Sequence, residues 1–231
     1  MLFRQMFDLA SSTYTYLLAS GVGREAFIID PVKDQLKQYL AVIADLDLKL
    51  VTAIDTHTHA DHITALGSLR DTLGCVTVMG KHTKAECVSY RVSEGEILKA
   101  DGISLRALFT PGHTNESFSF LLEGQGAPAV FTGDVLLIRG SGRTDFQGGD
   151  PHASWNSIVN ILFQLPDETT VYPAHDYKGW TASSIGEERH HNPRLANKTE
   201  DQYVAIMRSL ILPNPKLMDV AVPANLACGK A

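Results

Sequence analysis

The densest group of metal-binding side chains in this sequence lies in residues 56–62, which read Thr-His-Thr-His-Ala-Asp-His. An apolar segment typical of a buried strand comes just before it. In an extended chain His57 and His59 point to the same side, while Asp61 and His62 are placed to extend from the first turn of a following helix. Imidazole and carboxylate groups are common ligands of zinc and iron. The run therefore predicts a metal site at the end of a strand.

Three more donors occur singly, and each follows a predicted strand. His113 and Asp134 lie in tight turns that contain glycine, and His175 follows a short strand near the last third of the chain. Tight turns of this kind depend on the conformational freedom of glycine. Because functional loops often gather at one edge of a sheet, we expect these donors to meet the histidine-rich run.

The seven donors fit two arrangements. In the first, two ions bridged by Asp134 activate water for hydrolysis, with His57, His59 and His113 on one side and Asp61, His62 and His175 on the other. In the second, one ion takes two histidines and one carboxylate and keeps three open positions, as non-haem Fe(II) does when it binds O2 and substrate. Spacing alone does not choose between them.

The elements that position these donors alternate between strands and helices. Predicted strands cover the region around Met6 and residues 14–19, 26–30, 49–55, 76–79, 103–110, 117–122, 129–132 and 170–172, and predicted helices cover 35–45, 61–73, 154–165 and 200–212. Residues 213–223 form a proline-rich tail. This pattern indicates an α/β enzyme, and we expect a single domain over residues 1–231.

Composition narrows the class of partner. The chain has 231 residues, 44% of them hydrophobic, and a formal net charge of −6 without a basic cluster. Nucleic acid and anionic membranes are therefore poor candidates, and a small solute is the better one. No apolar run reaches the ~18–20 residues of a membrane span, and the start of the chain shows no signal-peptide pattern. We expect a soluble protein of the bacterial cytoplasm, or alternatively a mature mitochondrial matrix form.

The cysteines are few and far apart in the sequence. Cys75, Cys87 and Cys228 are odd in number, which is more typical of a reducing compartment than of a disulfide framework. We therefore predict three free thiols.

Taken together, the motifs His-x-His-x-Asp-His, Pro-Gly-His and Gly-Asp and the late histidine resemble those of the metallo-β-lactamase superfamily. They are more similar still to the persulfide dioxygenases of that superfamily. The segments that carry this resemblance are 3–7, 56–64, 131–140, 142–147, 172–177, 192–194 and 222–229. Thr58 and Ser141 stand where that family often has cysteine, and neither position is expected to bind metal.

The resemblance implies an αββα four-layer sandwich with one Fe(II) per chain, held by His57, His113 and Asp134. It leaves His59, Asp61, His62 and His175 as groups that hydrogen-bond around the ligands, and we interpret Asp176 as a further anchor of this kind. The implied reaction oxidises glutathione persulfide with O2 and water to sulfite and glutathione.

Glutathione carries two carboxylates, so the implied substrate requires cations near the iron. The candidates are Arg139, Arg143, Lys178 and Arg189, with Tyr177 as a hydrogen-bonding partner for the peptide part of the substrate. Cys228 is a candidate gate or persulfide acceptor. A second copy of the chain, giving a homodimer, is a further expected partner.

Two other functions compete with this interpretation. A hydrolase like glyoxalase II uses two metals to cleave a thiolester, but it normally adds a helical C-terminal domain, for which the segment after His175 leaves little room. A non-catalytic metal-binding or persulfide-binding protein would have little reason to keep the complete set of donors.

Overall fold

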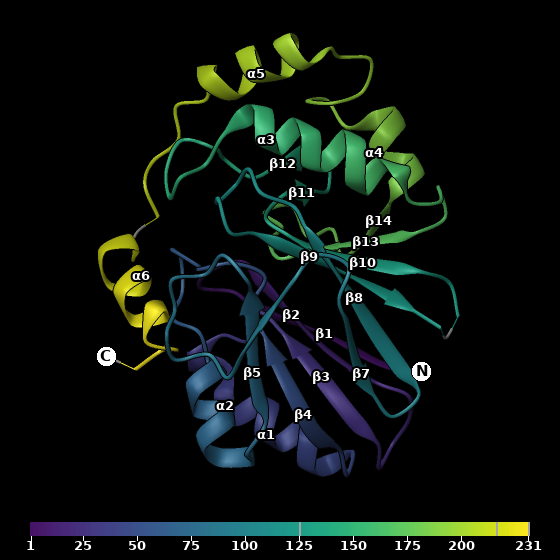
Figure 1. Cartoon of the computed structure of the whole chain (residues 1–231), viewed down its shortest axis with the longest axis vertical. Helices are drawn as coiled ribbons and strands as arrows, with labels where there is room; N and C mark the ends of the chain where they lie inside the picture. Colours follow the sequence, from purple (N-terminus) through teal and green to yellow (C-terminus); the bar gives the residue numbers. More distant parts are fainter. Residues whose placement is uncertain (125, 216, 231) are drawn as a thin grey trace.

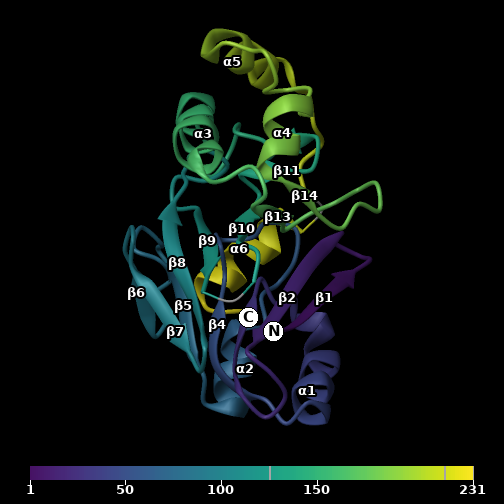
Figure 2. The ribbon, with the colours of Figure 1, turned by 90° about the vertical axis from the view of Figure 1, so that its right-hand side faces the viewer.

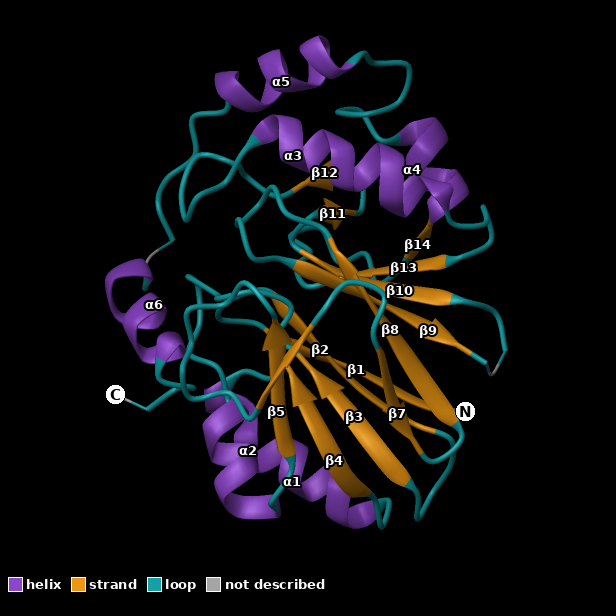
Figure 3. Ribbon diagram, viewed as in Figure 1, coloured by secondary structure: helices purple, strands orange, loops and turns teal. Residues whose placement is uncertain are grey.

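The computed structural model describes all residues except 125, 216 and 231. Two six-stranded sheets face each other (Figures 1 and 3). The first contains, in spatial order, β1 (Leu2–Asp8), β2 (Thr13–Ala19), β3 (Glu25–Ile29), β4 (Lys49–Ile54), β5 (Val76–Gly80) and β6 (Tyr90–Val92). The second contains β14 (Ser183–Ser184), β13 (Thr170–Pro173), β10 (Ala129–Gly133), β9 (Phe118–Glu123), β8 (Ile103–Phe109) and β7 (Ile97–Ala100).

Helices cover the outer face of each sheet (Figure 2). The first sheet carries α1 (Leu36–Asp45) and α2 (Leu66–Leu73), with the short turn η1 (Lys33–Gln35) before α1. The second sheet is covered by α3 (Pro151–Asn156), the π-helix η2 (Ser157–Ile161), the 3-10 helix η3 (Leu162–Gln164) and α4 (Ile185–His191), and α5 (Glu200–Ser209) packs against α3. β11 (Leu136–Leu137) and β12 (Gly140–Ser141) pair as a two-stranded ribbon. The last helix, α6 (Met218–Leu226), lies at the side of the molecule. The expected αββα sandwich is confirmed.

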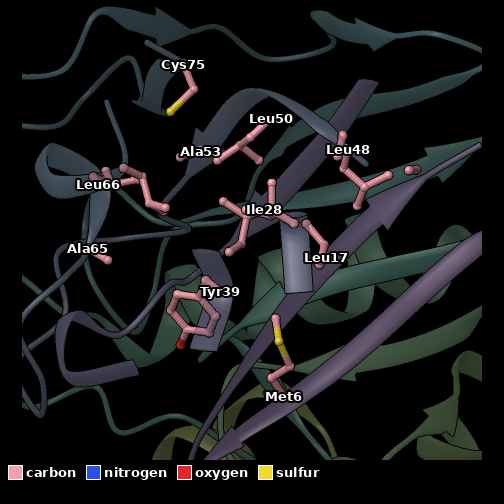
Figure 4. Close-up of a cluster of buried hydrophobic side chains, with 14 of the residues drawn as sticks. Met6, Leu17, Ile28, Tyr39, Leu48, Leu50, Ala53, Ala65, Leu66 and Cys75 are labelled. Carbon is pink, nitrogen blue, oxygen red and sulfur yellow. The ribbon is translucent and has the colours of Figure 1, made fainter. Parts of the chain in front are cut away.

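Three apolar cores hold the four layers together. In β2, Leu17 faces the helices of the first core, while Tyr16 and Leu18 face the second sheet. This alternation follows from the two-residue period of a strand, and it makes every residue of β2 buried. Figure 4 shows Leu17 beside Ile28 and Tyr39 in the core under α1 and α2. A third core lies between the second sheet and α3, α4 and α5.

The helix predicted over 61–73 begins only at Leu66, so the expectation that Asp61 and His62 lie in a first helical turn is wrong. The chain before Leu66 bonds to other segments instead, as when the Ala65 N–H donates to the Pro31 carbonyl over 2.7 Å. These tertiary bonds replace the intrahelical bonds that a longer helix would have formed.

Other boundaries differ in smaller ways. The helix predicted over 154–165 begins at Pro151 and loses α geometry after Asn156, and the helix predicted over 200–212 ends at Ser209. Strands β6 and β7 were not predicted, and α6 forms within the predicted proline-rich tail with Pro223 inside it. None of the helices among the described residues is long and apolar enough to cross a membrane.

The prediction of three free thiols is wrong for two of the cysteines. Cys87 and Cys228 form a disulfide that closes a separation of 141 residues, and Cys75 alone remains a free, buried thiol. Cys228 is therefore not available as a thiol in this form of the protein. The distance along the sequence concealed the pairing, because α6 folds back onto the loop between β5 and β6.

Gly80 ends β5 where the two sheets pack closely, and a Cβ at this position would collide with the buried Phe118 ring. We predict that Gly80→Ala lowers the free energy of unfolding by about 1–3 kcal/mol, because overpacking displaces the ring. Urea denaturation is the measurement. Gly21→Ala is the control, since a Cβ there meets only Arg24 at 3.9 Å. Equal stability of both variants would contradict the close packing.

Candidate metal centre

Loops from both sheets meet at one edge of the sandwich. The loop after β4 carries the histidine-rich run, and the chain after β8, β10 and β13 carries His113, Asp134 and His175 in turn. Backbone hydrogen bonds join the loops across the sheets, from the Phe118 N–H to the Thr56 carbonyl over 2.9 Å and from the Tyr14 N–H to the Ala174 carbonyl over 2.7 Å. The predicted gathering of donors is therefore present.

The first donor cluster contains His57, His113 and Asp134, whose ligand atoms lie within 4.8 Å of one another. The Nδ1 of His113 lies 2.8 Å from the Arg143 carbonyl, so this nitrogen must carry the proton. Its Nε2 faces the Asp134 carboxylate at 3.6 Å. A neutral ring with a free Nε2 is the form that binds a metal.

His57 is fixed in the same tautomer. The Thr56 hydroxyl donates to Asp30 over 3.0 Å, so over 2.9 Å it accepts from the Nδ1 of His57. Burial lowers the pKa of His57 well below its ordinary value, and the neighbouring His59 acts in the same direction. Both histidines of the first cluster are thus held through Nδ1, which leaves Nε2 to face the cluster, as a metal site requires.

A second cluster contains His59, Asp61 and His62, whose ligand atoms also lie within 4.8 Å of one another. His59 donates its Nε2 proton to Asp30 over 3.1 Å, and Nδ1 of His62 lies 2.9 Å from Asp61. The remaining nitrogens, Nδ1 of His59 and Nε2 of His62, are buried without a hydrogen-bond partner among the described residues.

His175 lies between the two clusters. Its Nδ1 is 2.6 Å from Asp134 and its Nε2 is 2.9 Å from Asp61. Burial lowers the pKa of His175, but the two carboxylates outweigh this effect and hold it well above its ordinary value. Each ring nitrogen thus faces a carboxylate to which it can donate, and the buried ring joins the two clusters.

Buried side chains also hold the backbone of the histidine-rich loop. Asp30 accepts the Thr56 N–H over 2.7 Å, Glu116 accepts the Thr58 N–H over 2.6 Å, and Gln147 donates to the Thr58 carbonyl over 2.9 Å. None of these three contacts was predicted from the sequence, and neither were the three that Asn225 in α6 makes with the same loop. The available signals were an aspartate ending an apolar strand and a glutamate just after the Pro-Gly-His motif.

The four candidate cations have different surroundings. Arg139 pairs with Glu187 and Glu188, and Arg189 pairs with Asp167. Arg143 pairs with Asp145 over 2.6 Å and lies against the Phe146 ring. Lys178 is exposed and forms no ion pair within the described part of the chain, with its ammonium 5.5 Å from the Trp180 ring centroid.

The segment after His175 lies against the candidate site. The Tyr177 ring stacks on His175 with centroids 5.9 Å apart, although 73% of the residue is exposed. Asp176 accepts the backbone N–H groups of Lys178 and Trp180 over 2.8 and 2.7 Å. In the observed geometry Asp176 therefore shapes the turn that carries Tyr177 and Lys178.

Comparison with known proteins gives a consistent result. Residues 9–175 match the family described as the metallo-beta-lactamase superfamily. The chain is 44% identical to the mitochondrial persulfide dioxygenase ETHE1 of Mus musculus, over 99% of this chain and 89% of that protein. A crystal structure of ETHE1 from Myxococcus xanthus has a TM-score of 0.95 and 50% identity, and the match covers 99% of this chain and 100% of that one.

Similarity to a hydrolase is weaker. Hydroxyacylglutathione hydrolase of Dictyostelium discoideum is 29% identical over 80% of this chain and 70% of that protein.

Asp55 lies behind the histidine-rich loop, and burial raises its pKa to about 8. Between about pH 4 and pH 8 the folded protein therefore holds a proton that the unfolded chain releases, so the free energy of unfolding falls as pH rises. We predict that Asp55→Asn makes this decrease shallower in metal-free protein. The measurement is urea denaturation at a series of pH values, and an unchanged slope would contradict the prediction.

Proposed function

The chain belongs to the metallo-β-lactamase superfamily and, within it, to the persulfide dioxygenases, and from this premise we propose its chemistry. It oxidises glutathione persulfide with O2 and water to sulfite and glutathione. We place one Fe(II) per chain between His57, His113 and Asp134. A bound Fe(II) supplies open coordination positions where an anionic sulfur and O2 can meet.

The hydrogen bonding of His175 is the observation that most supports a single ion. A second ion bridged by Asp134 would need a lone pair on His175, but both of its ring nitrogens donate to carboxylates, at 2.6 and 2.9 Å. We propose that a protonated His175 takes the place of a second cation between Asp134 and Asp61. Its bond to Asp134 also orients that carboxylate toward His57 and His113.

The protein's own part is to orient the reactants and control water. The Phe146 ring lies edge-on to His113 with centroids 6.1 Å apart, and Tyr177 stacks on His175. These two rings place apolar surface beside the first cluster. We propose that they border the persulfide position, with Lys178 beyond them as a cation for a glutathione carboxylate.

The other three candidate cations are less free to bind a carboxylate of glutathione. Arg143 can bind a carboxylate only in competition with Asp145, and Arg139 and Arg189 already neutralise carboxylates of the protein. Their contact with glutathione remains a prediction, as do the homodimer and the cytoplasmic location.

A binuclear thiolester hydrolase is the alternative function. The unpartnered nitrogens of His59 and His62 favour it, because a second ion would satisfy both. The identity to persulfide dioxygenases is higher and extends over nearly the whole chain, so the oxygenase remains the better supported function.

We predict that His113→Ala abolishes iron binding and O2 uptake on glutathione persulfide together, because two remaining ligands leave a weak, open site. His62→Ala should keep most of its iron, since it removes a group outside the proposed ligand set. Iron analysis and an oxygen electrode give both values. Complete loss of iron from His62→Ala would show that the proposed ligand set is wrong.

We predict that Lys178→Met raises the KM for glutathione persulfide and lowers kcat/KM about tenfold, as expected for one lost charge-assisted contact. Iron content should not change. Lys99→Met is the matched control and should leave KM unaltered, because Lys99 is exposed on β7 opposite the start of β8, away from the loop after β8 that carries His113. A persulfide without carboxylates should be nearly insensitive to Lys178→Met, and equal losses on both substrates would argue against a recognition role.

A further inference from the structure

The C-terminal segment reaches back to the histidine-rich loop through one buried side chain. The Asn225 amide nitrogen donates to the carbonyls of His59 and His62, both over 2.8 Å. Its amide oxygen accepts the Thr64 N–H, also over 2.8 Å. One side chain that is only 3% exposed therefore satisfies three backbone groups of residues 59–64.

These hydrogen bonds influence where the histidine rings of the metal loop lie. The ring centroids of His59 and His62 lie 4.3 Å apart, and those of His57 and His59 lie 4.2 Å apart. Because the rings are packed in series, a shift of the backbone at His59 displaces His57 as well. Without Asn225 the two carbonyls would be left buried and unsatisfied, so the loop would have to rearrange or admit water.

The described residues just before α6 are largely exposed, with Ile211 97% exposed and Leu217 47% exposed. Their side-chain tie to the site loops is Arg143, which donates to the Pro213 carbonyl over 2.7 Å. On its C-terminal side the segment that carries Asn225 is fixed by the Cys87–Cys228 disulfide. The Gly67 N–H also donates to the Cys228 carbonyl over 3.0 Å, which ties the same point to α2.

We propose that Asn225 is a positioning residue for the metal loop and that the Cys87–Cys228 disulfide is the redox-dependent anchor that keeps it there. The inference rests on the proposed metal site, but it concerns the order of residues 57–64 and can be tested without iron or persulfide.

The two sulfurs differ in accessibility, which sets the route of opening. Cys87 is half-buried, while Cys228 is only 1% exposed. A dithiol reductant attacks the Cys87 sulfur, forming a mixed disulfide there and releasing the Cys228 thiolate. The second thiol of the reductant then displaces Cys87. Two electrons and two protons pass to the protein, which gains two thiols, and the reductant becomes a cyclic disulfide.

The first test is hydrogen exchange of metal-free protein. Cys87→Ser should speed amide exchange in residues 57–64 and 218–229, and a dithiol should have the same effect on the wild type but no effect on Cys87→Ser. Cys75→Ser is the matched control, because that thiol is buried and unpaired, and its exchange should match the wild type in both states. Unchanged exchange of residues 57–64 in Cys87→Ser would overturn the proposal.

The second test measures metal binding with Co(II), whose absorption spectrum reports ligand geometry. We expect Cys87→Ser and Asn225→Ala to bind Co(II) about tenfold more weakly or worse, with an altered spectrum. Asn225→Asp keeps the size and the acceptor but loses both donated bonds, so it should behave like Asn225→Ala. Wild-type affinity and spectrum in both Asn225 variants would refute the positioning role, even if thermal stability were reduced.

A monothiol provides the check on access. Glutathione under mildly reducing conditions should form its mixed disulfide on the Cys87 peptide, as read by mass spectrometry. An adduct on Cys228 instead would contradict the proposed route of opening.

Discussion

The structure depends on satisfying the backbone of an irregular, buried loop. Residues 56–64 carry most of the metal-type donors yet contain neither helix nor strand, so their N–H and C=O groups need partners from elsewhere. Asp30, Glu116, Gln147 and Asn225 supply them, from four separate parts of the chain. The loop can therefore hold its donors in place only when both sheets, the loop after β12 and α6 are all folded around it.

The layering explains why these partners converge. The buried strands of the first sheet pack on α1 and α2 through one face and on the second sheet through the other, and this brings the ends of β4, β8, β10 and β13 to one edge. His175 then links the two donor clusters with its two ring nitrogens. The packed sheets thus bring the donor loops together, and the hydrogen bonds of His175 to the two carboxylates fix the donor clusters relative to each other.

Much of this arrangement is readable from sequence because it is local. His57, His113 and Asp134 follow strands whose apolar patterns are clear, and glycine marks the turns of His113 and Asp134. The contacts that fix the tautomers and the loop are not local: Asn225 lies 166 residues from His59, and Cys87 lies 141 residues from Cys228. The spacing of apolar residues predicted a helix that begins at Asp61. Hydrogen bonds to other segments keep the chain out of a helix until Leu66. No periodic pattern in the sequence indicates contacts over such distances, so they become visible only in the folded structure.

The central claim is one iron in the first cluster, with His175 filling the second position as a cation. The most direct measurement is anomalous diffraction at the iron edge on crystals of protein shown to consume O2 with glutathione persulfide. We expect a single peak bound by His57, His113 and Asp134. Two well-occupied metal peaks bridged by Asp134, with His175 turned to bind the second, would contradict it.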